Sequence, residues 1–138
     1  ETGRGDAGLV KWTHERKEGA SVNDNIIVHI TARLFAEEKC YGPGVHRLLG
    51  AVAQNHSLRA AAASMNMAYS KAWSIVRAAE QGFGCKLLRS TIGGSGGGGA
   101  QLTDEARQIM EAYDAYCRKL DAYGQELFRE LFGFRTEK

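Results

Sequence analysis

Apolar and polar residues alternate from Asn25 to Leu34, in the sequence NIIVHITARL. A period of two, rich in β-branched residues, is typical of a half-buried β-strand. The residues that precede it are largely polar and show no such period. We therefore expect a flexible arm over residues 1–24 and a strand at the start of the folded domain.

Three helices are predicted next, because apolar residues then recur at spacings of three and four. The first runs from Pro43, which suits the first helical position, to about Asn55. Ser57 is a suitable N-cap for a short second helix, and a third runs from about Ala68 to Gln81. The apolar stripe of this third helix comprises Tyr69, Ala72, Trp73, Val76, Ala79 and Phe83.

The second and third helices are joined by the turn Met65-Asn66-Met67, in which Asn66 suits a left-handed backbone. Two short helices around such a turn predict a helix-turn-helix, whose second helix places its first residues in the major groove of DNA. Plain structural packing of an alanine-rich helix pair is the alternative. If DNA is bound, the expected base-reading residues are Tyr69, Ser70, Lys71 and Ser74, with Arg59 and Arg77 at phosphates.

The glycine-rich stretch TIGGSGGGGAQLT, residues 91–103, reads either as a linker or as the tip of a hairpin. A linker requires an independently folded unit on each side. The flanking segments CKLLRST and AQLT are too short to form separate units, which favours their pairing in a hairpin over residues 87–102. A hairpin after a recognition helix is a wing, and glycines let its backbone approach a sugar-phosphate chain closely. The wing residues expected at DNA are Arg89, Gly94, Ser95, Gly96 and Gly97.

From Thr103 onward apolar residues keep helical spacing almost to the end of the chain. A helix of this length, aromatic on one side, exceeds what one small domain covers, so we expect it to pair with a second copy. The alternative is that it folds back over its own core. The organisation predicted is a winged helix-turn-helix over 25–102 and a dimerisation helix with its tail over 103–138. The expected interface residues are Ile109, Met110, Tyr113, Tyr116, Leu120, Tyr123 and Leu127.

Charge is unevenly distributed along the 138 residues, whose net charge is +2. Residues 42–99 carry +5, whereas 1–41 carry −1 and 100–138 carry −2. A positive middle is expected where one face meets a polyanion such as double-stranded DNA. The composition, 43% hydrophobic and 25% charged, suits one globular domain. No apolar run is long enough to span a bilayer, and we expect a cytoplasmic protein.

Motifs for metal binding and catalysis are not apparent. Cys40, Cys85 and Cys117 are odd in number and far apart, which argues against a disulfide framework, and none has zinc spacing with a histidine. Neither a Ser-His-Asp arrangement nor paired carboxylates can be recognised. We predict no enzyme, no metal and no cofactor, and leave open a redox switch at Cys85, beside the wing.

The segment from Leu48 to Thr103 resembles the N-terminal DNA-binding domain of the molybdate-responsive regulator ModE, and more distantly the LysR-type winged helix. The resemblance extends from about Ile26 to Leu131, most of the chain. The most specific matches are AYSKAW and GGSGGGGAQLT. The resemblance implies a mainly α fold with a small β-sheet, dimerised through its long terminal helix. Such a protein binds operator DNA, often palindromic, and regulates transcription. It also implies that Trp73 lies in the core and Tyr69 near DNA.

Four positions depart from the family pattern. Ala68 stands where the family has a serine, and Ser70 stands where it has a lysine, with Lys71 one place later. Ser90 and Ser95 stand at basic positions of the wing. Because a shift of one residue turns a side chain by about 100° on a helix, operator sequence and affinity are not carried over.

The regulator also has C-terminal oxyanion-binding domains that are absent from these residues, so the chain resembles a stand-alone DNA-binding domain. Direct molybdate sensing is not implied, and any signal is expected through a partner protein or a small ligand. The displaced lysine and arginine motivate an alternative function. The chain would then be a winged-helix interaction module that has lost specific DNA binding.

Overall fold

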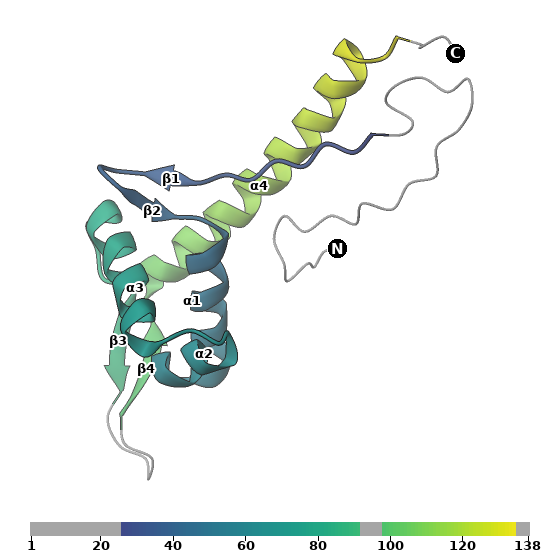
Figure 1. Ribbon diagram of the computed structural model, residues 1–138. Helices are drawn as coiled ribbons and strands as arrows, with labels where there is room; N and C mark the ends of the chain where they lie inside the picture. The colour runs from purple at the N-terminus through teal and green to yellow at the C-terminus, as the bar shows by residue number, and fades with distance from the viewer. Residues whose placement is uncertain (1–25, 92–97, 135–138) are drawn as a thin grey trace. The chain divides into compact units, whose positions relative to one another are not determined.

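The computed structural model describes residues 26–91 and 98–134. These form two compact units, residues 32–113 and residues 26–31 together with 114–134. The fold is mainly helical with two small antiparallel sheets, which confirms the predicted fold class. In chain order the elements are β1 Leu34–Phe35, β2 Lys39–Tyr41, α1 Pro43–Asn55, α2 Leu58–Ser64, α3 Tyr69–Phe83, β3 Leu88–Thr91, β4 Gly99–Leu102 and α4 Asp104–Leu131 (Figure 1).

Local signals in the sequence determine where the helices begin and end. Pro43 opens α1, and the Ser57 hydroxyl caps α2 by accepting the Ala60 N–H at 3.0 Å. Asn66, in the turn between α2 and α3, has a φ of 55°, the left-handed conformation expected there. Gly84 ends α3 with a φ of 72°. These boundaries match the predicted helix-turn-helix to within a residue or two.

The core of the first unit joins the three short helices to the start of α4. Ala61, Ala62 and Ala72 are at most 1% exposed, and their small side chains let α2 and α3 approach closely. Of the predicted apolar stripe on α3, Ala72, Val76 and Ala79 are buried, whereas Tyr69 and Phe83 are more than a third exposed. The largest fully buried side chains are Tyr41, Leu48, Leu49, Leu87, Val52 and Val76.

The predicted strand over residues 25–34 is largely wrong, because only its last residue, Leu34, lies in a strand, β1, which pairs with β2. The alternation of burial is nevertheless present from Val28 onward, with even-numbered residues half-buried and odd-numbered ones exposed. Within the second unit the segment packs against a helix. Gln125 donates to the Val28 carbonyl at 3.0 Å, and a Cβ at Gly124 would meet Ile30. A helix surface therefore produces the period of two that we interpreted as a sheet.

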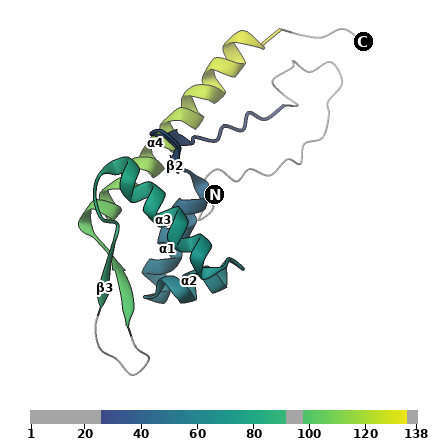
Figure 2. The ribbon, with the colours of Figure 1, turned by 60° about the vertical axis from the view of Figure 1, so that its left-hand side comes forward.

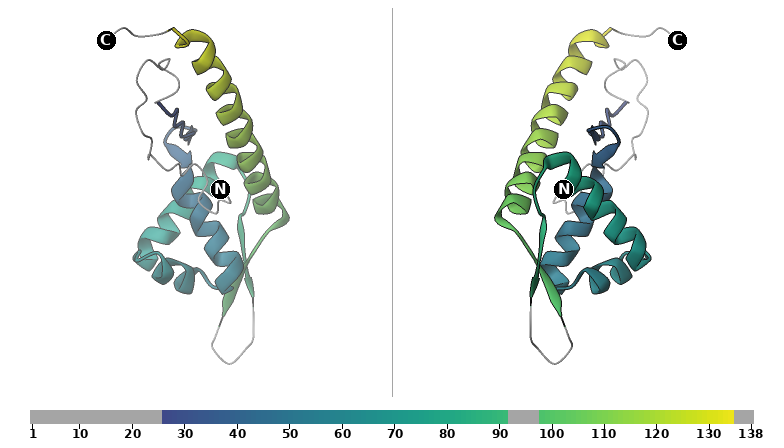
Figure 3. Two further views of the ribbon diagram at one scale, coloured as in Figure 1. Left: turned by 90° about the vertical axis from the view of Figure 1, so that its right-hand side faces the viewer. Right: turned by 90° about the vertical axis from the view of Figure 1, so that its left-hand side faces the viewer.

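The predicted hairpin is confirmed. β3 and β4 pair antiparallel, with Leu88 opposite Leu102 and Thr91 opposite Gly99. Figures 2 and 3 show the end of β3 and the start of β4 at the same end of the unit as α2. The predicted tip residues Gly94, Ser95, Gly96 and Gly97 lie outside the described residues.

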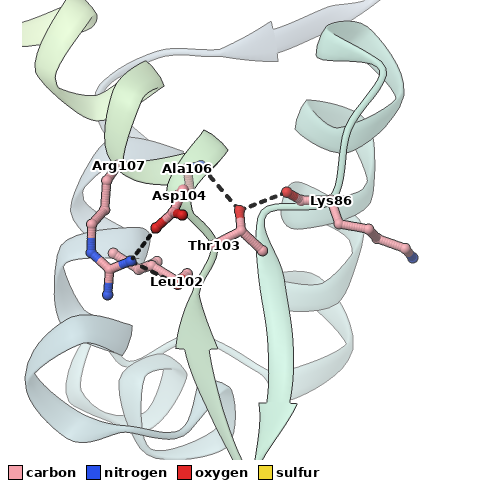
Figure 4. A network of polar contacts seen from close by, with 6 residues as sticks. All are labelled: Lys86, Leu102, Thr103, Asp104, Ala106 and Arg107. Carbon is pink, nitrogen blue, oxygen red and sulfur yellow. Dashed lines mark hydrogen bonds and ion pairs between the residues drawn. The ribbon is translucent and has the colours of Figure 1, made fainter.

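Thr103 closes the base of the hairpin and starts α4 (Figure 4). Its hydroxyl donates to the Lys86 carbonyl at 2.7 Å and accepts the Ala106 N–H at 3.1 Å. Its own N–H donates to the Leu87 carbonyl at 3.0 Å. One residue therefore ties the hairpin to the first turn of the long helix.

The compact winged-helix unit extends past Leu102 into α4, as far as Tyr113. Tyr113 is 4% exposed, its ring lies 5.0 Å from that of Tyr41, and its hydroxyl donates to the Ala32 carbonyl at 2.8 Å. The ring of His46 packs against the ring of Tyr113, with centroids 4.8 Å apart, and its Nδ1 is hydrogen-bonded to the Tyr41 hydroxyl at 2.8 Å. Tyr113, which we expected at a dimer interface, is thus already buried within its own unit.

Candidate nucleic-acid interface

The outward face of α3 gathers most of the residues predicted to meet DNA. Ser70, Lys71, Ser74 and Arg77 are all exposed there, and Tyr69 is 37% exposed. None of the four is needed to hold the helix in place, because Ala72, Val76 and Ala79 make its buried contacts. The N-terminal half of the helix therefore presents hydroxyl, ammonium and phenol groups to solvent, the donor and acceptor types that read base edges.

A groove of about 460 Å³ lies between this helix and the hairpin. Its lining includes Tyr69 and Trp73 of α3, Arg89 and Ser90 of the hairpin, and Arg59 of α2. Arg59, Tyr69 and Arg89 are thus brought together from three elements. Both arginines are exposed, so the groove is open to a negatively charged ligand.

Trp73 occupies a different place from the one expected. It is only half-buried and lines the groove, where we expected it in the core. Its helical spacing from Ala72 and Val76 puts it at the edge of the apolar stripe, where a large ring covers part of the core and still reaches the surface. Ser57, Ser90 and the glycines at 98 and 99 also line the groove, although the sequence pattern did not predict them there.

Two guanidinium groups lie on aromatic rings of α3. The Cζ of Arg59 is 4.1 Å from the centroid of the Tyr69 ring, and the Cζ of Arg77 is 5.4 Å from that of Trp73. The two rings meet edge to face, with centroids 6.5 Å apart. The two aromatic rings of α3 therefore lie between two arginines, Arg59 of α2 and Arg77 of α3.

Glu80, the acidic residue of α3, has a structural role within the fold. Glu80 is the one acidic residue of residues 42–99, and its side chain is 12% exposed. Its carboxylate accepts the Leu87 N–H at 2.9 Å and lies 3.9 Å from the Lys86 ammonium. Glu80 thus fixes the turn from α3 into the hairpin, and its charge does not oppose a polyanion at the groove.

The hairpin is held close to the helix-turn-helix at Gly99. The Ala100 N–H donates to the His56 carbonyl at 3.0 Å, in the turn between α1 and α2. A Cβ at Gly99 would lie 2.6 Å from that carbonyl oxygen and 2.8 Å from the Thr91 hydroxyl. Only glycine fits at this contact, so this residue of the glycine-rich stretch has a definite packing role.

No cluster of three or more histidine, cysteine, aspartate or glutamate side chains suitable for a metal ion occurs among the described residues. All three cysteines are free thiols and half-buried. Within the same ranges, no helix has the length and apolar character needed to cross a membrane.

Residues 46–107 match the family model described as "Bacterial regulatory helix-turn-helix protein, lysR family". The match covers α1 through the hairpin and the first turn of α4. This segment is therefore similar to the helix-turn-helix domain of LysR-type regulators, and helix-turn-helix domains are a common means of DNA binding.

Two curated relatives share about a third of their residues with part of the chain. The molybdenum transport protein ModE of Herbaspirillum seropedicae is 33% identical over 72 residues, which are 52% of this chain and 27% of the relative. The molybdenum-pterin-binding protein MopB of Rhodobacter capsulatus is 34% identical over 68 residues, 49% of this chain and 25% of the relative. The matched region spans about a quarter of each relative. The domain is thus similar to a helix-turn-helix of molybdenum-related proteins, as the resemblance predicted.

Proposed function

We propose that this chain is a dimeric, sequence-specific transcriptional regulator that reads operator DNA with α3. The observation that carries the proposal is the exposed face of Ser70, Lys71, Ser74 and Arg77 beside a groove with Arg59 and Arg89 at its edges. In this arrangement α3 enters the major groove, and the arginines bind the phosphates next to it. The hairpin then contacts the flanking backbone.

The second half of the proposal is that two copies pair through α4. Ile109, Tyr116 and Tyr123 recur every seven residues, and so do Leu120 and Leu127, a spacing typical of a coiled-coil seam. Tyr116 and Tyr123 are 54% and 61% exposed. Ile109, Leu120 and Leu127 are half-buried, and Met110 is also half-buried. Pairing through this seam would cover aromatic surface that the chain itself leaves in water.

The names of the relatives suggest the pathway. Because both are molybdenum-related, we propose that the target genes serve molybdenum uptake or use. The metal-binding and transport activities in those names are not transferred. About three quarters of each relative lies outside the match, and the described residues hold no metal-ligand cluster.

Selection from random duplexes, followed by fluorescence anisotropy on the selected sequence, tests this function. We expect a palindromic site with half-sites about 34 Å apart. Lys71→Ala/Arg77→Ala is expected to weaken binding about 10- to 100-fold. The matched control is Arg118→Ala/Lys119→Ala, which removes the same charge from exposed positions on α4. With about three phosphate contacts in each protomer, the logarithmic salt slope is expected near −5.

Two results would contradict the proposal. The first is a wild-type protein that binds the selected duplex no better than a scrambled one. The second is an equal loss of affinity in the α3 variant and in the α4 control. Either result, together with a protein that co-purifies with the chain, would favour the interaction module instead.

A further inference from the structure

The stack of two aromatic rings between two arginines on α2 and α3 has a consequence for the arginines that the proposed function uses. Arg59 belongs to α2, and its guanidinium lies over the ring of Tyr69 at 4.1 Å. Trp73, four residues along α3 from Tyr69, contacts the Tyr69 ring by its edge, and Arg77 lies over Trp73 four residues further. The order of the stack is therefore arginine, tyrosine, tryptophan, arginine.

The way in which an arginine is held decides what it can still bind. A carboxylate partner would occupy two guanidinium N–H donors and cancel most of the charge. An aromatic face holds the same group through its π-electrons and leaves the N–H donors at the edge of the guanidinium plane. Among the described residues, neither Arg59 nor Arg77 forms an ion pair with a carboxylate. Both arginines are exposed, so their donors face solvent.

Holding these side chains in advance also lowers the entropic cost of binding. A free arginine side chain loses up to about 2 kcal/mol of rotamer entropy when it is fixed against a ligand. On a ring, part of that loss has already occurred before DNA arrives. The ring thus makes each phosphate contact tighter without adding a charge.

We propose that Tyr69 and Trp73 are positioning residues that hold Arg59 and Arg77 ready for DNA phosphates. This inference rests on the proposed DNA binding and assigns the two aromatic side chains a role in it. Tyr69 then acts through Arg59 and does not need to touch a base.

A double-mutant cycle on the selected operator tests the Tyr69–Arg59 pair. Tyr69→Leu is expected to weaken binding about three- to ten-fold with an unchanged salt slope, because the number of cations is the same. Arg59→Ala is expected to weaken binding and to lower the slope by about 0.9 for each protomer. In the Arg59→Ala background, Tyr69→Leu should have almost no further effect. Tyr69→Phe retains the ring face and should bind like the wild type.

A second measurement needs no DNA. Because the Cζ of Arg59 lies 4.1 Å from the centroid of the Tyr69 ring, we expect upfield ring-current shifts of the Arg59 Hδ protons in the NMR spectrum of the free protein. These shifts should persist in Tyr69→Phe and disappear in Tyr69→Leu. The same test applies to Arg77, whose side-chain protons should lose their upfield shifts in Trp73→Leu.

The outcomes separate this inference from the function on which it rests. If the wild type lacks a specific operator, the proposed function fails, whatever the spectra show. If the wild type binds and Tyr69→Leu binds equally well, only the positioning role fails. Additive losses in the cycle would also overturn it, because they would mean that Tyr69 contacts DNA directly. Unshifted Arg59 protons in the free wild type would overturn it as well.

Discussion

The apolar side chains of α1 are buried, whereas those of the later part of α4 are largely exposed. Leu48, Leu49 and Val52 on α1 are each 0% exposed. On α4, Tyr116 is 54% exposed, and Tyr123 and Leu131 are each 61% exposed. Beyond Tyr113, none of the described α4 residues is fully buried.

The difference shows which part of the chain is complete by itself. In the winged-helix unit the helices, the hairpin base and the first turns of α4 enclose one core. The other described segment has a helix and the short stretch 26–31, and these cover only part of the apolar surface. A large exposed aromatic surface of this kind marks an interaction site, which supports the proposed pairing through α4.

The sharpest test of this contrast is a matched pair of leucine truncations. Leu49→Ala leaves a cavity in a fully buried site and should lower the free energy of unfolding by about 3–4 kcal/mol. Leu131→Ala removes the same atoms from a residue that is 61% exposed. This variant should change the free energy of unfolding by less than about 0.5 kcal/mol. Urea unfolding at low protein concentration measures both. Equal losses would mean that α4 is as much a part of the core as α1.

The second test concerns the seam itself. Tyr116→Asp/Tyr123→Asp puts two charges into the proposed interface and should convert a dimer into a monomer, as followed by sedimentation. Operator binding should weaken about 100-fold, because two half-sites can no longer be held together. Ala122→Asp, at an exposed position about 100° around the helix from Tyr123, is the control for added charge. A wild-type protein that is a monomer at all concentrations would contradict the seam.

A smaller effect is expected at the link between the hairpin and the turn after α1. In Gly99→Ala the new Cβ would lie 2.6 Å from the His56 carbonyl oxygen, and the backbone must move at a cost of about 2 kcal/mol. Gly98→Ala meets nothing closer than 3.5 Å and should stay within about 0.5 kcal/mol of the wild type. Thermal unfolding compares the two. Operator binding should weaken in Gly99→Ala alone, and an equal effect of both variants would exclude a specific contact.

The smallest effect concerns the start of α3. Ala68 has an extended backbone, with φ −64° and ψ 144°, and offers no side-chain cap. Ala68→Ser should therefore supply the missing acceptor and stabilise the unit by about 0.5–1 kcal/mol. The reverse change, Ser57→Ala, removes the cap of α2 and should destabilise it by about 1 kcal/mol. Chemical unfolding measures both, and a loss of stability in Ala68→Ser would show that the added hydroxyl has no N–H to accept.

Features with local causes were predictable from the sequence. The Ser57 cap, the left-handed Asn66 and the two hairpin strands each depend on residues close together in the chain. The segment 26–33 was misread, because a helix and a sheet impose the same alternation on a strand-like segment. The half-buried position of Trp73 at the groove and the burial of Tyr113 depend on neighbours distant in sequence, such as Arg89 and Tyr41. The pairing of Arg59 with Tyr69 required knowing how α2 and α3 cross.

The bonds of Thr103 to Lys86 and Leu87 close the hairpin as a ring at its base. Because the cost of closing a loop grows only slowly with its length, an insertion between Thr91 and Gly98 should change the stability of the domain by less than about 1 kcal/mol. The structure of the helix-turn-helix and of α4 should not be affected by a longer connection. A peptide tag or a fluorescent reporter inserted there would mark the wing while the rest of the domain folds as before.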